Sequence, residues 1–239
     1  ACLSVERLYV ERNVAEKFTE LCVAKTKKLK IGSGLDPDTE IGPMIRAGQV
    51  ARVEEQLHDA VARGARVLAG GARRADLGDC FFEPTVVTGV DHTMLLMQEE
   101  TFGPVMAICP VADSAEAVRL ANDSEFGLGA TVWTRDTGRG RGIAGQLQVG
   151  TVMVNDVASY FAICEAPHGG RGASGWGRTH SKLGLLALVQ VKYVDVDRLP
   201  RVPKSWWYGY SEELAVAVDR FLEMLFAPTF RERMRSARG

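Results

Sequence analysis

The stretch "MAICPVADSAEAVRLANDSEFGLGATVWTRD", residues 106–136, decides the fold class. Its apolar run Met106–Val111 predicts a strand, because short apolar runs bounded by turn residues are typical of buried strands. A helix is predicted from about Ser114, and the run Thr131–Thr134 predicts another strand. Strands that alternate with helices in this way are typical of an α/β domain, in which helices cover both faces of a twisted, mainly parallel sheet.

The alternation continues after residue 136. A helix is predicted across Ile143–Leu147 and a strand over Thr151–Val154. In sheets of this kind, the groups that bind or react gather at the carboxyl ends of the strands. Asn155 follows the last of these strands directly, so it is a candidate site residue. A long irregular loop is expected over residues 156–182, and loops of that length inside a compact domain are usually functional.

Two further helices are predicted nearer the start of the chain. The segment "NVAEKFTELCVAKTKKL", residues 13–29, has apolar residues at helical spacing, with Asn13 and Glu16 in the arrangement of a capping box. The segment "VARVEEQLHDAVARG", residues 50–64, repeats the pattern and is expected to end at Gly64. Each helix is predicted to bury one face.

Composition limits the class of protein. The chain has 239 residues, 46% of them hydrophobic, and a net charge of -1, which argues against a general nucleic-acid-binding surface. No apolar run reaches the length of about 18 residues that a membrane span needs. The five cysteines form no pair or cluster with metal-ligand spacing, so no metal site is predicted. They are expected to be reduced thiols, which places the chain in the cytoplasm.

Two short motifs are ambiguous when each is taken alone. The stretch "GRGASG", residues 170–175, satisfies G-x-G-x-x-G, but no strand precedes it and no helix follows it, as a dinucleotide loop requires. We interpret it as a tight glycine loop that lets two backbone segments approach each other. The stretch "QEETFGPV", residues 98–105, has two adjacent carboxylates, which are typical of a solvated loop or helix end.

Taken together, five motifs in order along the chain resemble the aldehyde dehydrogenase superfamily. They are C-x4-R at Cys2–Arg7, "EETFGP" at Glu99–Pro104, "NDSEFGLGATVWTRD" at Asn122–Asp136, "GTVMVND" at Gly150–Asp156 and "PHGGRGASGWGR" at Pro167–Arg178. The resemblance covers most of residues 1–196 and corresponds to the C-terminal, catalytic-domain portion of the family. It implies that Cys2 is the nucleophile and Arg7 the arginine that follows it. The chain is then expected to begin inside the nucleophile motif. The family's dinucleotide-binding domain, general-base glutamate and oxyanion-binding asparagine would lie upstream.

The resemblance also assigns the other candidate site residues. Glu100 is expected to accept hydrogen bonds from the ribose hydroxyls of NAD or NADP, and Phe102 is expected to pack beside the nicotinamide. Asn155 is expected at the rim of the aldehyde tunnel. His168 stands where much of the family has a phenylalanine that lines the substrate pocket, so it is a candidate substrate-binding residue and leaves the aldehyde undefined. A histidine there is compatible with a satisfied loop residue, a polar pocket wall or a proton carrier.

The reaction that the family implies is the NAD(P)+-dependent oxidation of an aldehyde to a carboxylic acid. A thiolate suits it, because it is nucleophilic near neutral pH and forms a thioester that water can hydrolyse. Two alternatives stay open at this stage. The thioester could be taken by CoA instead of water, or the isolated chain, without a cofactor domain, could be a non-catalytic assembly domain.

The expected organisation is a catalytic domain over residues 1–186, truncated at its N-terminal side, an oligomerisation strand over residues 187–198 and a helical extension over residues 199–239. In the family such a protruding strand supports subunit assembly, so a homo-oligomer, dimer or tetramer, is expected. In the extension, Ser211 is predicted to cap a helix with one apolar face. The neighbouring Trp206–Tyr208 cluster also allows an interfacial membrane anchor. Packing against the body or a partner subunit is favoured, because the polar face of the helix is acidic.

Overall fold

The computed structural model describes residues 2, 4–202, 204 and 207–229, and it divides into two compact units, residues 1–190 and 191–239. The elements of the first unit are β1 (Arg7–Glu11), α1 (Arg12–Thr26), α2 (Ala47–Ala62), β2 (Arg66–Ala69), β3 (Thr85–Thr88), α3 (Leu95–Gln98), β4 (Val105–Val111), α4 (Ser114–Asn122), β5 (Gly129–Val132), α5 (Thr137–Ala144), β6 (Thr151–Val154), a 3-10 turn (Ser159–Ala162) and α6 (Ser181–Leu186). The second unit contains α7 (Glu212–Phe226).

The strands form two sheets instead of the single sheet that the sequence predicts. Strands β1, β4, β3 and β2 make a four-stranded sheet in that order, in which β4 runs parallel to both neighbours and β2 is antiparallel to β3. Strands β5 and β6 pair in parallel in a separate two-stranded sheet. The physical reason is that β1 and β3 occupy both edges of β4, so β5 has no edge of β4 to pair with. The α/β class with mainly parallel pairing is confirmed.

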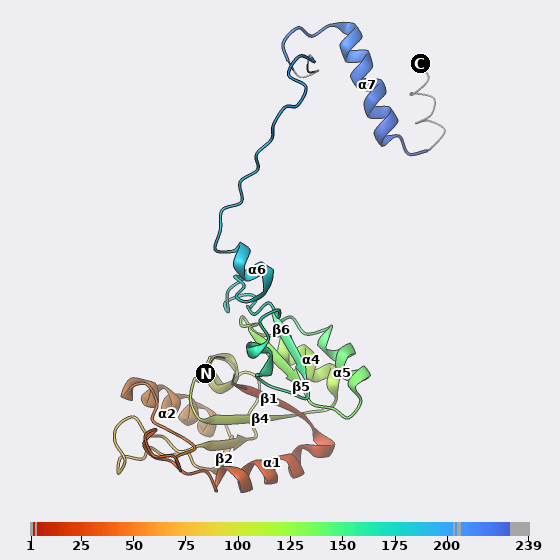
Figure 1. Ribbon diagram of the computed structural model, residues 1–239. Helices are drawn as coiled ribbons and strands as arrows, with labels where there is room; N and C mark the ends of the chain where they lie inside the picture. The colour runs from red at the N-terminus through yellow and green to blue at the C-terminus, as the bar shows by residue number, and fades with distance from the viewer. Residues whose placement is uncertain (1, 3, 203, 205–206, 230–239) are drawn as a thin grey trace. The chain divides into compact units, whose positions relative to one another are not determined.

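Helices cover both faces of the four-stranded sheet, as the sequence predicts (Figure 1). Because successive side chains of a strand point to opposite faces, Val86 and Val87 enter different cores. Val87 packs in the core that includes residues of α2, whereas Val86 packs with Phe18 and other residues of α1. Strand β4 alternates in the same way through Ala107 and Ile108. These two cores fix the sheet between α1 and α2.

The starts of helices α1 and α5 differ from the predictions for a physical reason that the structure shows. Helix α1 follows β1 without a turn and has no side-chain cap, so the predicted capping box at Asn13 is wrong. A related reciprocal cap does form at α4, where Asp113 accepts from the Glu116 N–H at 2.9 Å and the Glu116 carboxylate accepts from the N–H of Ala112, the residue before the N-cap, at 2.6 Å. Helix α5 spans residues 137–144 instead of 143–147, because Asp136 caps it by accepting from the Arg139 N–H. Its glycines hide the helical pattern.

The glycine loop at residues 170–175 has the structural role that we inferred for it. Gly172 has φ of +56° and pairs with Phe126 in an isolated antiparallel bridge. A Cβ atom on Gly172 would overlap the carbonyl oxygen of Glu125, so only glycine permits this approach. The loop therefore packs against the segment between α4 and β5.

The segment expected to be an oligomerisation strand forms no strand within the described part of the chain. Residues 187–190 continue from α6 as turns, and residues 191–197 have no backbone partner strand among the described residues. An extended segment needs the edge of another strand to complete its hydrogen bonds. Its role in assembly stays a prediction.

In the second unit, α7 begins after Ser211, whose hydroxyl accepts from the Leu214 N–H at 3.2 Å. Over the described residues, no helix combines the length and the apolar composition that crossing a membrane requires.

Candidate functional site

Glu6 joins the segment after Cys2 to the turn that carries Glu100 and Phe102. Its Oε2 accepts from the Thr101 N–H and its Oε1 from the Phe102 N–H, each at 3.1 Å. Burial raises the pKa of the Glu6 carboxyl, the two backbone hydrogen bonds lower it, and the charge of Glu100 raises it. The bonds span more than 90 positions in the sequence. The start of β1 and the "EETFGP" motif are therefore one local structure.

The turn at Phe102 is held from the side of α2 as well. Phe102 adopts φ of +48°, a left-handed conformation that costs a residue with a side chain about 1 kcal/mol or more. Gln49 of α2 donates through Nε2 to the Thr101 carbonyl at 2.8 Å. At Gly103, an added Cβ would come within 2.5 Å of Val53 Cγ2, so the chain passes close under α2. The Phe102 side chain remains 44% exposed.

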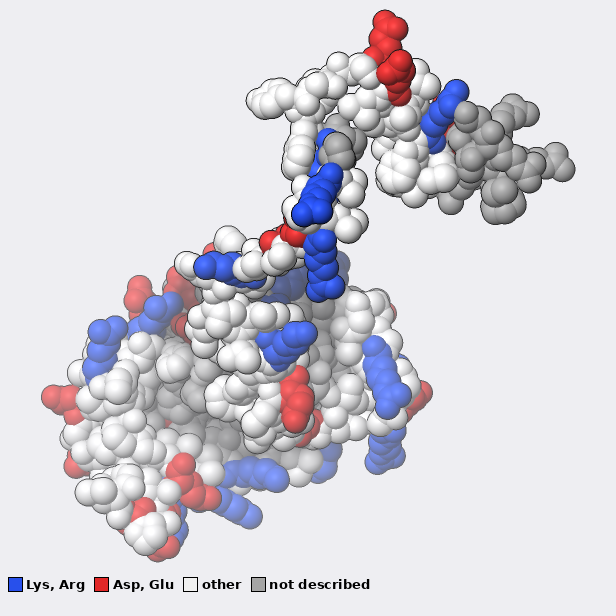
Figure 2. Space-filling view, turned by 45° about the horizontal axis from the view of Figure 1, so that its top comes forward, with Lys and Arg blue, Asp and Glu red and all other residues white. Residues whose placement is uncertain are grey.

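Glu100 lies in an open hollow of about 690 Å³. The hollow is lined by Gly48, Ala51, Arg52, Glu55, Glu99, Glu100, Glu125 and Phe126. Arg52 donates to Glu99 at 3.3 Å and is the only Lys or Arg in this lining. The hollow is therefore acidic, and its carboxylates can accept hydrogen bonds or face a cationic group. On the face that Figure 2 presents, acidic and basic side chains are interspersed over the first unit.

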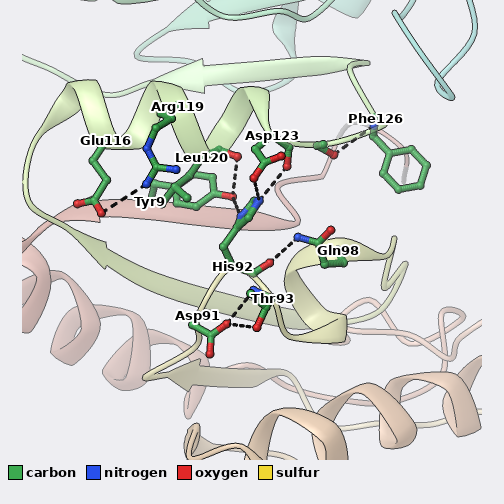
Figure 3. A network of polar contacts seen from close by, with 11 residues as sticks. Tyr9, Asp91, His92, Thr93, Gln98, Glu116, Arg119, Leu120, Asp123 and Phe126 are labelled. Atoms are coloured by element: carbon green, nitrogen blue, oxygen red, sulfur yellow. Dashed lines mark hydrogen bonds and ion pairs between the residues drawn. The ribbon is translucent and has the colours of Figure 1, made fainter.

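A polar network supports the hollow from the side of β1 and α4 (Figure 3). His92 Nε2 lies 2.8 Å from the Asp123 carbonyl oxygen and 3.3 Å from its carboxylate. Because a carbonyl can only accept, Nε2 carries a proton. Nδ1 of the same ring lies 3.1 Å from the Tyr9 hydroxyl oxygen, and that hydroxyl donates to the Leu120 carbonyl at 3.4 Å. Burial raises the pKa of Tyr9 to about 12, so this hydroxyl stays protonated. The network connects β1 with the segments that lead into Glu99 and Glu125.

Cys2 is exposed and lies ahead of Glu6 on the segment that enters β1. Tyr160, on the 3-10 turn after β6, is buried. Burial raises the pKa of Tyr160, and the charge of a Cys2 thiolate contributes to the same rise, so these two residues lie near each other. The thiol at one end of the chain is thus brought to the loop that follows β6.

His168 lies in a small cluster of rings in that loop. It is 9% exposed, and its ring centroid lies 5.4 Å from Tyr160, 5.5 Å from Phe161 and 6.4 Å from His180. Burial lowers the pKa of His168, and the nearby His180 and Arg178 lower it further, so the ring is neutral at pH 7. The Nδ1 atoms of His168 and His180 are buried and have no hydrogen-bond partner among the described residues.

Asn155 has a local structural task. It adopts φ of +61°, its Oδ1 accepts from the Thr134 N–H at 2.8 Å and its Nδ2 donates to the Thr134 carbonyl at 2.8 Å. Both polar groups of its side chain are thereby bound to the backbone just after β5. Its predicted place at the rim of a substrate tunnel stays a prediction.

Within the described residues, no group of three or more His, Cys, Asp and Glu is arranged to hold a metal ion.

Four of the five candidate residues thus fall into two groups within the first unit, and Asn155 belongs to neither. Glu100 and Phe102 belong to the turn that Glu6 holds, and Cys2 and His168 both lie near Tyr160. Glu6, Tyr160 and His180 were not predicted from the sequence as site residues. Glu6 stands inside the C-x4-R motif, which is the one signal that could have drawn attention to it.

Comparison with known proteins decides the family. A family model described as "Aldehyde dehydrogenase family" matches residues 1–194. The chain belongs to the aldehyde dehydrogenase family. The resemblance noted from the five motifs is therefore confirmed.

Aldehyde dehydrogenases similar to this chain include named relatives and solved structures. A putative succinate-semialdehyde dehydrogenase [NADP(+)] 2 of Mycobacterium ulcerans is 41% identical over 213 residues, covering 86% of this chain and 41% of the relative. A succinate semialdehyde dehydrogenase of Acinetobacter baylyi is 40% identical over 192 residues, covering 80% of this chain and 39% of the relative. A crystal structure of Staphylococcus aureus betaine aldehyde dehydrogenase in complex with NAD+ matches with a TM-score of 0.74 and 40% identity, covering 78% of this chain and 37% of that one. The chain therefore spans about two fifths of the length of these aldehyde dehydrogenases.

Proposed function

We propose that this chain carries the nucleophile and the nicotinamide-facing wall of an NAD(P)+-dependent aldehyde dehydrogenase that forms a carboxylic acid. The observation that carries the proposal is the Glu6 carboxylate. It follows the exposed Cys2 thiol closely along the chain and binds the two N–H groups of the turn with Glu100 and Phe102. The two motifs expected to act on one substrate and one cofactor are thereby joined.

Cys2 acts as the nucleophile in this proposal. Its thiolate adds to the aldehyde carbon, which forms a C–S bond and turns the carbonyl oxygen into an oxyanion. When the oxyanion collapses to a carbonyl, the hydrogen on that carbon leaves with its electron pair, and a thioester on Cys2 results. Bound NAD(P)+ supplies the acceptor for that hydride. Water then adds to the thioester, releases the carboxylic acid and returns the thiol.

The residues of the hollow fit the nicotinamide end of the cofactor. The Glu100 carboxylate can accept from two ribose hydroxyls, and the half-exposed Phe102 ring offers an apolar wall for a flat ring. The oxidised nicotinamide is cationic, so an acidic hollow favours it. The same carboxylates disfavour the pyrophosphate, which must be held elsewhere in the protein.

The substrate in this proposal is a small aldehyde whose distal part faces the loop after β6. His168 is proposed as a polar but neutral wall of that region, packed between aromatic rings, and Asn155 as a residue of its rim. Relatives are named for succinate semialdehyde with NADP+, and a solved structure is of a betaine aldehyde dehydrogenase with NAD+. Both cofactors and both aldehydes are therefore the first to be tried.

Residues 187–198 are the proposed assembly strand of a homo-oligomer, a dimer or a tetramer. Val191, Tyr193, Val194 and Val196 are each more than 70% exposed, as expected of a strand whose partner belongs to another chain. A cytoplasmic location is proposed from the unpaired cysteines, all five of which are free thiols in the structure. No nucleic acid and no membrane is proposed as a partner.

The test is turnover by the complete protein that carries this chain, followed by product analysis. Succinate semialdehyde and betaine aldehyde are each supplied with NAD+ or NADP+, and reduced cofactor and acid are measured with and without CoA. We expect one acid formed for each reduced cofactor, and no turnover after Cys2→Ser. An acyl-CoA product would instead identify a CoA-acylating enzyme. Activity that survives Cys2→Ser would remove Cys2 as the nucleophile, and no turnover of any aldehyde would favour an assembly domain.

A further inference from the structure

We propose that Glu6 is a positioning residue for hydride transfer, which fixes Glu100 and Phe102 relative to Cys2 by binding the backbone of their turn. The inference rests on the proposed function and adds to it a residue that touches neither the aldehyde nor the cofactor. It is carried by the geometry of the carboxylate and of the turn.

The carboxylate of Glu6 uses one oxygen for each of two consecutive N–H groups. Oε2 receives the Thr101 N–H and Oε1 the Phe102 N–H, both at 3.1 Å. Consecutive N–H groups that point to one side form a concave anion-binding site, which a carboxylate matches with its two oxygens. A neutral amide would match only one of the two, because its NH2 group would face a second donor.

The turn needs such a restraint because it is strained. Phe102 has φ of +48°, a conformation that persists only when surrounding contacts impose it. Gln49 holds the Thr101 carbonyl from one side, at 2.8 Å, and Glu6 holds the two N–H groups from the other. Without Glu6, the peptide groups before and after Thr101 could rotate toward ordinary dihedral angles. That rotation would move both the Glu100 and the Phe102 side chains.

The charge of Glu100 also acts on Glu6. The two carboxylates are close enough for the charge of Glu100 to raise the pKa of Glu6, although burial is the larger cause. Like charges repel, so an ionised Glu6 disfavours any position of Glu100 that turns back toward β1. Glu100 lines the open hollow. Glu6 therefore holds the backbone of the turn from which the Glu100 side chain reaches the hollow.

Glu6 is connected to the nucleophile by the chain itself, because it stands on the short segment between Cys2 and β1. One residue thus sets the separation between the thiol and the groups proposed to hold the nicotinamide ribose. Misplacement of reacting groups by about 1 Å can cost on the order of 100-fold in rate. Loss of Glu6 should therefore reduce hydride transfer more than it reduces the reactivity of the thiol.

The experiment compares Glu6→Gln and Glu6→Ala with the wild type in the complete protein. Hydride transfer is followed as reduced cofactor, with kcat and the KM for NAD(P)+ measured separately. Acylation of Cys2 is followed with p-nitrophenyl acetate, which needs no cofactor. Glu40→Gln is the matched control, because the exposed Glu40 carboxylate also accepts a backbone N–H, that of Lys30 at 3.0 Å, and does not line the hollow. Amide hydrogen exchange of Thr101 and Phe102 is measured in the wild type and in Glu6→Gln.

We expect both Glu6 variants to lower kcat by about tenfold or more and to raise the KM for NAD(P)+, with acylation of Cys2 within about twofold of the wild type. Glu40→Gln should leave all three unchanged. Equal losses of acylation and of hydride transfer would show that Glu6 only supports folding, and this result would overturn the proposal. Unchanged hydride transfer in Glu6→Gln would overturn it as well. Fast exchange of both amides in the wild type would overturn it even if the variants do not fold. A wild type without hydride transfer would instead refute the proposed function.

Discussion

At the scale of single residues, Glu100 is the proposed cofactor contact that is most open to test. Its carboxylate lines an open hollow, so replacing it changes a surface group and not the core. We expect Glu100→Gln to reduce turnover by the complete protein by about 100-fold, because the ribose loses a charged acceptor and the nicotinamide is misplaced. The midpoint of thermal unfolding should stay the same. Glu20→Gln, at an exposed position of α1, is the control, and an unchanged rate in Glu100→Gln would remove Glu100 from the site.

His168 makes stability depend on pH. Its pKa is lowered in the folded state by burial and by the nearby His180 and Arg178, so the unfolded chain binds that proton more readily. Stability should therefore fall as the pH decreases below the usual histidine value of about 6.5. We expect His168→Phe to weaken this dependence and to gain about 1 kcal/mol at pH 7, because it removes a buried Nδ1 without a partner. Unfolding midpoints at pH 7.5, 6.5 and 5.5 test this, with the exposed His58→Gln as control. Equal slopes in wild type and variant would contradict it.

At the scale of elements, the start of β6 depends on contact between two glycines. A Cβ atom at Gly150 would overlap the carbonyl oxygen of Gly169, which is backbone and cannot turn away. We expect Gly150→Ala to lower the free energy of unfolding by about 3 kcal/mol. Gly142→Ala in α5 is the matched control, because nothing lies within 4 Å of its added Cβ. A helix-interior alanine should stabilise the chain by up to about 1 kcal/mol. Chemical denaturation measures the free energy of unfolding of both variants. Equal values would show that the backbone segments at Gly150 and Gly169 separate easily.

Elements with strong local signals could be predicted from the sequence, whereas long-range pairing could not. Strand β6 has the predicted bounds, and β4 and α4 differ by at most a residue at the start, because β-branched runs and an Asp cap act locally. The separation of β5 from β4 depends on β1 filling an edge, which no short motif encodes. Glu6 was missed for the same reason, since its partners lie 95 and 96 positions away.

The helix α7 carries an apolar stripe that the described residues of its own unit do not bury. Phe221, Leu222 and Leu225 are each more than 40% exposed, and a lone helix of this length is marginal in water. We expect deletion of residues 205–239 to change the oligomeric state or to lower solubility, with no binding to anionic vesicles in either form. The acidic polar face disfavours anionic lipid. Size-exclusion chromatography measures the oligomeric state, and vesicle flotation measures lipid binding. If flotation required residues 205–239 while the oligomeric state did not change on their deletion, the expectation would be contradicted.

At the scale of the whole molecule, we expect the 239-residue chain alone to show no steady-state turnover of aldehydes. The chain spans 41% of the length of the Mycobacterium ulcerans relative, and we propose only the nicotinamide end of the cofactor for its acidic hollow. Slow covalent modification of Cys2 by an aldehyde remains compatible with this. Absorbance of reduced cofactor, recorded with purified chain at high concentration, tests the expectation. Sustained production of reduced cofactor would show that the chain needs no other segment.

The central claim, that Cys2 is the nucleophile, is tested most directly by competitive alkylation of the cysteines. Cys2 and Cys164 are both exposed, whereas the other three are half-buried or buried, so Cys164 controls for access. The complete protein is treated briefly with iodoacetamide at pH 7 and mapped by mass spectrometry. A thiol that reacts as a nucleophile should be alkylated first, so we expect Cys2 to be labelled at least tenfold faster than Cys164. Equal labelling, or faster labelling of Cys164, would contradict the assignment.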